Sequence, residues 1–176
     1  MIECFVNEKI DNSIIINADE IPFDKKSRQY CSANLCGEYG RTWTCPPAAG
    51  ETEECLNRVK SFEKAFVFTH KGYISDMKDS LQIDILRNET MDILYSVCEK
   101  LRKDGVSYLA LGCSGCKLCG KCTYPDAPCR FPEKAVYPVE AFCVDVASLA
   151  SKIGFDYLAG ANIVTFFCII LFEELK

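Results

Sequence analysis

The sequence has little histidine, an excess of negative charge and no long hydrophobic segment. His70 is the only histidine, which excludes a two-cysteine, two-histidine zinc finger and a Rieske centre, because each needs two histidine ligands. The chain has 20 basic and 25 acidic residues and shows no basic stripe, so we expect no nucleic-acid partner. Its longest apolar run, residues 163–172, is too short to cross a bilayer, so we expect no membrane partner either.

The first residues also lack the features of a secretory signal peptide. Residues 1–4 (MIEC) show neither a basic end nor the start of an apolar segment, so we expect a cytoplasmic protein. Cysteine, by contrast, is abundant: the chain has 13, an odd number that cannot all pair as disulfides. Clustered cysteines in a reducing cytoplasm are more often metal ligands or catalytic groups than disulfides. We therefore expect a metal that is held mainly by sulfur.

The apolar periodicity predicts a single α/β domain over residues 1–176. We expect strands at 13–17, 65–69, 106–111 and 163–172, and helices at 51–62, 76–103 and 139–153. The long helix would connect strands 65–69 and 106–111 as a crossover, which favours a parallel pair. The expected fold is a small, mostly parallel or mixed sheet flanked by helices. Two irregular cysteine-rich loops, residues 21–50 and 112–138, would interrupt it.

Five cysteines stand close together in the second of these loops. They form the pattern C-x2-C-x2-C-x2-C-x6-C and are Cys113, Cys116, Cys119, Cys122 and Cys129. Three cysteines at this spacing let a short turn wrap an iron–sulfur cube, as in bacterial ferredoxins, where a further cysteine ligates another cluster. Glycines within the loop allow the close approach of backbone N–H groups to cluster sulfurs. The pattern therefore predicts an iron–sulfur site.

The first loop carries a second group, Cys31-x4-Cys36-x8-Cys45, followed by two prolines that stiffen it. Together the two loops offer eight thiolates, enough for two 4Fe–4S clusters. The simplest partition assigns one cluster to Cys116, Cys119, Cys122 and Cys129, and the other to Cys31, Cys36, Cys45 and Cys113. A cluster that takes ligands from both loops would link distant parts of the chain through metal, so loss of the cluster should unfold that end of the molecule.

The spacing leaves alternatives open. Cys113 and Cys129 can exchange places between the clusters, and so can Cys45 and Cys129. Zinc is the main rival metal. Four-cysteine zinc sites favour two well-separated C-x2-C pairs, whereas consecutive x2 steps crowd one site and favour a cubane.

Longer stretches of the chain resemble an uncharacterised family of predicted metal-binding proteins of anaerobic prokaryotes. The resemblance rests on the motifs C-x4-C-x8-C-P-P, residues 31–47, and C-x2-C-x2-C-x6-C-R-x-P, residues 116–132. The matching stretches are 36–47 (CGEYGRTWTCPP), 116–122 (CKLCGKC), 128–135 (PCRFPEKA) and 140–146 (EAFCVDV). It covers most of residues 31–155. The resemblance implies cysteine-ligated metal in a cytosolic protein and brings no established reaction. Cys113 departs from the pattern expected of the relatives, which would leave an open iron or a different fourth ligand in the N-terminal cluster.

The cysteines outside these two groups, and the aromatic residues beside the predicted ligands, fit ordinary packing roles. Cys55, Cys98, Cys143 and Cys168 lie on apolar faces and are expected in the core, while the role of Cys4 is open. Aromatic residues beside the ligands, namely Tyr39, Trp43 and Tyr124, are expected to shield a cluster or to form a hydrophobic lid.

Three functional hypotheses follow. The first is an iron–sulfur protein that transfers electrons or supports a partner redox enzyme, so that a redox protein is the expected partner. The second is an enzyme that uses an open cluster iron as a Lewis acid, with Arg41, Arg130 or His70 contacting the substrate. The third is a zinc-binding structural or interaction module. The sequence assigns no catalytic residue and no oligomeric state.

Overall fold

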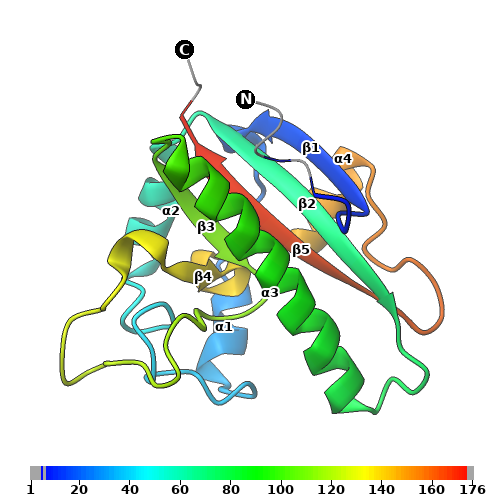
Figure 1. Cartoon of the computed structure of the whole chain (residues 1–176), viewed down its shortest axis with the longest axis horizontal. Helices are drawn as coiled ribbons and strands as arrows, with labels where there is room; N and C mark the ends of the chain where they lie inside the picture. Colours follow the sequence, from blue (N-terminus) through cyan, green and yellow to red (C-terminus); the bar gives the residue numbers. More distant parts are fainter. Residues whose placement is uncertain (1–4, 6, 174–176) are drawn as a thin grey trace.

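A five-stranded mixed sheet forms the centre of the computed structural model, which describes residue 5 and residues 7–173 (Figure 1). Its strands are β1 (Asn12–Asn17), β2 (Lys64–Tyr73), β3 (Tyr108–Gly112), β4 (Val136–Pro138) and β5 (Ile163–Phe172). They lie in the order β1-β2-β5-β3-β4. Only β3 and β4 pair in parallel, and the other three pairs are antiparallel. The predicted α/β class is confirmed, with a mixed sheet.

The expected direct pairing of the second and third strands is wrong. β2 and β3 run in the same direction, but β5 lies between them and pairs antiparallel with both. The reason lies in the composition of β5, which is apolar on both faces and buried over its second half. A strand of this kind gains most from the centre of a sheet, where helices cover both of its faces. The ten residues of β5 pair with β2 along their whole length.

Helix α3 (Ser80–Lys103) covers one face of the sheet (Figure 1). It begins at Asp79, whose carboxylate accepts hydrogen bonds from the main-chain N–H groups of its first turn. It ends before Gly105, which has the positive φ of +73° that closes many helices, as the sequence predicts. The buried stripe of α3 packs on Phe66, Phe68 and Ile170 of the sheet, among others.

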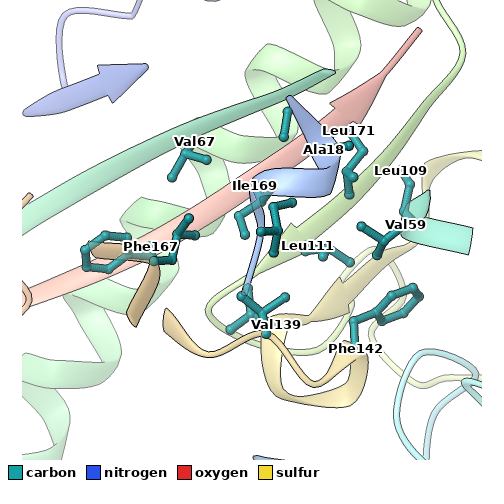
Figure 2. Close-up of a cluster of buried hydrophobic side chains, with 14 of the residues drawn as sticks. Ala18, Val59, Val67, Leu109, Leu111, Val139, Phe142, Phe167, Ile169 and Leu171 are labelled. Atoms are coloured by element: carbon teal, nitrogen blue, oxygen red, sulfur yellow. The ribbon is translucent and has the colours of Figure 1, made fainter. Parts of the chain in front are cut away.

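The opposite face of the sheet packs on α2 (Thr52–Lys60), the 3-10 helix η4 (Val139–Phe142) and α4 (Val146–Ile153). Figure 2 shows this second core, with Val59, Phe142 and sheet residues such as Ile169 and Leu171 converging. The predicted helix at 51–62 is therefore confirmed with shorter bounds. Alternate residues of each central strand serve the two cores, as the pleat of a strand requires.

The helix predicted over 139–153 is divided in the structure. Cys143 has a left-handed backbone conformation with φ of 58°, which ends η4. Asp145 then caps a new helix, α4, by accepting a hydrogen bond from Ser148 N at 3.0 Å. The predicted end of this helix at Gly154 is confirmed, because Gly154 has φ of 73°.

The two cysteine-rich stretches contain more regular structure than we expected. The first stretch contains α1 (Ser27–Ser32), so that Cys31 lies on a helix, and the short 3-10 helix η2 (Ala18–Glu20) directly precedes the stretch. The second ends in the 3-10 helix η3 (Pro132–Lys134) and in β4, which joins the sheet. The prediction of wholly irregular loops at 21–50 and 112–138 is therefore wrong at these points.

Candidate metal centre

The two cysteine-bearing segments lie together at one end of the molecule, next to α1 and below β4 in Figure 1. The Thr44 hydroxyl oxygen accepts a hydrogen bond from Cys116 N at 3.1 Å. The indole N–H of Trp43 donates to Ala127 O at 3.0 Å, and its ring meets Tyr124 edge-on at a centroid distance of 5.0 Å. These contacts join residues that are about 70 to 85 positions apart in the chain.

Two adjoining cavities open at this end, and cysteines line both. The first hollow has a volume of about 330 Å³, and its cysteines all come from the second loop: Cys116, Cys119, Cys122 and Cys129. The second hollow has a volume of about 610 Å³, and its cysteines come mainly from the first loop: Cys31, Cys36, Cys45 and Cys113. Lys117 and Glu38 line both hollows. Each hollow is lined by the four cysteines that the simplest partition groups together, and their role as metal ligands stays a prediction.

Among the cysteines of the second hollow, Cys45 is buried, Cys31 and Cys113 are partly buried, and Cys36 is exposed. Cys45 is 5% exposed, and burial raises the pKa of its thiol, while hydrogen bonds from the hydroxyls of Thr42 and Thr44 act in the opposite sense. Thr42 Oγ1 is buried and has no other hydrogen-bond partner in the described part of the chain, so its contact with Cys45 would strengthen if that thiol were ionised. Gly115 passes so close that an added Cβ would lie 3.1 Å from the Cys45 sulfur.

Cys31 is positioned by the neighbouring Arg28 on the same helix. Arg28 donates to Ala141 O at 3.3 Å and also to Gly50 O, so that α1 is tied to η4 and to the end of the first loop. Burial raises the pKa of the Cys31 thiol to about 11, and the carboxylate of Glu140 adds to this shift. Metal binding would therefore have to displace the proton of a thiol that is neutral at pH 7.

Cys113 occupies a different environment from the other seven cysteines. Its sulfur lies 3.9 Å from Arg87 O and next to the thiol of Cys168 on β5, and it packs against the core under α3. Cys168 is fully buried, and this burial, together with the adjacent Cys113, raises the pKa of the Cys168 thiol.

A tyrosine of α3 contacts the first hollow from the side. The Tyr95 hydroxyl lies 3.8 Å from the Cys116 sulfur, to which it donates, and it accepts a hydrogen bond from Lys117 N at 3.0 Å. Burial raises the pKa of Tyr95 well above its usual value, so this hydroxyl remains a donor at any ordinary pH. Such a bond would orient the sulfur and stabilise its negative charge.

The other candidates separate into core and surface residues. Cys55, Cys98, Cys143 and Cys168 are buried at 4% exposure or less, in keeping with the core role predicted for them. Cys4 lies outside the described residues. Arg41 is exposed and lines neither hollow, whereas Arg130 lines the first hollow and donates to Lys121 O at 2.9 Å.

His70 lines neither hollow. Its Nδ1 lies 2.8 Å from Lys9 O, and the carboxylates of Asp11 and Glu89 lie at 3.4 and 3.8 Å from its ring nitrogens. These contacts account for the histidine as a structural residue on β2.

Sequence reasoning missed the polar residues that helices bring to the hollows. Asp84 and Arg87 of α3 and Glu140 of η4 line the second hollow. Their spacing is that of ordinary helix surface residues, so no local pattern distinguishes them. Only their position beside a cysteine-rich segment in the fold marks them as candidates.

The donor set fits a soft metal, because thiolates prefer copper(I), zinc and iron–sulfur clusters. In the described part of the chain, no three cysteine, histidine, aspartate or glutamate side chains lie close enough to share one metal ion. Among the described helices, none is long and apolar enough to span a membrane.

Fold and site together define a mixed α/β protein with a cysteine-lined end. The chain belongs to the family described as predicted metal-binding protein (DUF2284), whose model matches residues 14–172. No curated protein and no solved structure matches the chain. The resemblance to a predicted metal-binding family is therefore confirmed, while the restriction of that family to anaerobic prokaryotes stays a prediction.

Proposed function

We propose that the protein binds two 4Fe–4S clusters in the cytoplasm. It would transfer electrons to or from a redox partner protein, or support the activity of a partner redox enzyme. Cys116, Cys119, Cys122 and Cys129 would hold one cluster. Cys31, Cys36 and Cys45 would hold the second, with a fourth ligand for which the sequence offers Cys113. The observation that carries this proposal is the pair of adjoining hollows, each lined by four cysteines.

The size of the hollows favours a cluster over single zinc ions. Four thiolates around one zinc ion each lie about 2.3 Å from the metal, so they converge on a point. The cysteines here instead line cavities of about 330 and 610 Å³. A bulky group with sulfur ligands at its corners suits that arrangement better.

The surrounding residues have defined roles in this proposal. Bound clusters would supply one-electron chemistry. Tyr95 would donate to the Cys116 sulfur, and the Trp43–Tyr124 pair, beside Cys129, would limit the access of water. Lys117, which borders both hollows, would offset part of the negative charge of the thiolates.

The test is metal and sulfide analysis of protein that is purified and reconstituted anaerobically. We expect about eight irons and eight sulfides per chain with broad absorbance near 400 nm. Cys119→Ser should reduce the iron content by about half. Cys98→Ala, a buried cysteine outside the hollows, serves as the matched control and should keep the full iron content. One or two zinc ions per chain without colour would overturn the proposal.

A further inference from the structure

Glu140 lies in the second hollow beside the cysteines of the first loop. It belongs to η4, which packs against α1 (Figure 1). The hydrogen bond from Arg28 to Ala141 O fixes this contact. Because Cys31 follows Arg28 by three residues on α1, it lies on the same helix face. The hydrogen bond from Arg28 therefore holds Ala141, which follows Glu140, against the helical turn that carries Cys31.

The Glu140 carboxylate has no ion pair with a described residue. Arg87, which also lines the hollow, is paired instead with Asp84 and lies over the ring of Phe166 at 5.5 Å. Burial raises the pKa of Glu140, and only its own main-chain N–H and the charge of Arg87 counter this effect. Glu140 is partly buried, and an unpaired carboxylate in such a position is stabilised when it coordinates a metal.

Cys113 faces a different part of the structure. Its sulfur contacts Arg87 O and the Cys168 thiol, both of which belong to the layer between α3 and the sheet. It also packs against the apolar core of that layer, so its position is accounted for as a packed thiol. Of the four cysteines that line the second hollow, Cys31, Cys36 and Cys45 are then available as ligands, whereas Cys113 is held against the core.

We propose that Glu140, in place of Cys113, supplies the fourth protein ligand of the metal group in the second hollow. This inference rests on the proposed function, since it completes the ligand set of one of its two clusters. The resulting donor set contains three thiolates and one carboxylate oxygen. Carboxylate is a harder ligand than thiolate and suits iron less well than sulfur does. The Glu140 position is therefore the one at which an external ligand would most easily enter, and the second hollow is nearly twice as large as the first.

The test compares four variants of the full chain after anaerobic reconstitution: Glu140→Gln, Glu140→Cys, Cys113→Ser and Glu38→Gln. Glu38 also lines this hollow, so Glu38→Gln is the matched control for the loss of a carboxylate. The readouts are iron and sulfide per chain and the electron paramagnetic resonance spectrum before and after reduction. Far-UV circular dichroism shows whether each variant has folded.

We expect Glu140→Gln to lose one iron or one whole cluster, so that iron falls from about eight to about seven or four per chain. Glu140→Cys should keep the full iron content but alter the electron paramagnetic resonance spectrum. Cys113→Ser and Glu38→Gln should match the unchanged protein in both iron content and spectrum. A halved iron content in Cys113→Ser together with an unchanged Glu140→Gln variant would overturn the inference and leave the proposed function intact. Unchanged protein that takes up no iron and sulfide would overturn both.

Discussion

Replacing Thr44 with valine would remove one of the hydrogen bonds that join the two cysteine-bearing segments beside their proposed ligands. Thr44 is 2% exposed, and its hydroxyl oxygen accepts from Cys116 N at 3.1 Å. Valine has nearly the same shape, so the substitution leaves no cavity, but it leaves this N–H without a partner. A fully buried donor left unpaired costs about 1–3 kcal/mol, and because the Cys116 N–H is only partly buried, the cost should lie near the lower end of that range. We expect the free energy of unfolding to fall by that amount, and iron to leave the loaded protein faster on addition of a chelator.

Thr90→Val provides the matched control, because Thr90 is equally buried and lies outside both hollows. Its hydroxyl donates to Leu86 O at 2.8 Å, and this carbonyl keeps its main-chain partner within α3 when the hydroxyl is removed. The control should therefore lose less stability than Thr44→Val and should keep the normal rate of iron release. Urea unfolding followed by circular dichroism measures the first quantity, and absorbance near 400 nm with a chelator measures the second. Equal stability and iron release in the two variants would refute the reasoning.

Three further changes test other parts of the structure. Gly112→Ala would place a Cβ 2.8 Å from the Met91 sulfur. Such overpacking should lower the free energy of unfolding, measured in urea, by about 1–3 kcal/mol. An unchanged urea midpoint would contradict the packing at the end of β3. Tyr95→Phe removes the donor to the Cys116 sulfur, so the midpoint potential measured by voltammetry of loaded protein should become more negative, and an unchanged potential would count against this contact. Asp145→Ala should lower the free energy of unfolding, measured in urea, by about 1 kcal/mol at pH 7. Hydrogen bonds lower the pKa of Asp145 below its ordinary value. The carboxylate therefore stabilises the fold above about pH 4, and this contribution is lost as the pH falls through the lowered pKa. A cost that stays constant between pH 6 and pH 3 would argue against this sign.

Much of the fold follows from local patterns in the sequence. Residues 163–172 are apolar on both faces and form the central strand β5 with those same bounds. The long helix also ends where its basic last turn and Gly105 predict. The neighbours of β5, however, depend on how the strand edges of the whole sheet fit together. Periodicity within a segment contains no information on that choice, so the insertion of β5 between β2 and β3 could not be predicted.

The break at Cys143 shows a second limit. Apolar residues recur at helical spacing across residues 139–153, yet the chain turns at Cys143 because its main chain pairs with the segment that precedes α1. Asp24 N donates to Cys143 O at 2.9 Å, and Asp145 N donates to Pro22 O at 3.0 Å. These long-range hydrogen bonds replace those that a continuous helix would have made. Tertiary contacts here prevail over a local preference.

For the candidate site, the spacing of cysteines predicts which of them gather around a common cavity. The four that line the first hollow come from one short stretch, where the chain cannot take them far apart. The helix residues that complete the hollows could not be predicted in this way, because Tyr95, Arg87 and Glu140 are brought there by the packing of α3 and η4. The same packing explains why spacing alone leaves the role of Cys113 open, since its position depends on Cys168, 55 residues further along the chain.

The cysteine-lined end also differs from the rest of the protein in how it is stabilised. Both apolar cores lie on the faces of the sheet, and the proposed ligands in the loops contribute little to either. The direct links between the two loops are few, chiefly the Thr44–Cys116 and Trp43–Ala127 hydrogen bonds and the Trp43–Tyr124 ring contact. Each such contact is worth roughly 1 kcal/mol, which is small against the entropy of ordering the residues of either loop. A bound metal group that takes ligands from several turns would supply the missing free energy, because binding to such a site is coupled to its folding. We therefore expect the sheet and its helices to form without metal, and the arrangement of the loops to depend on metal binding.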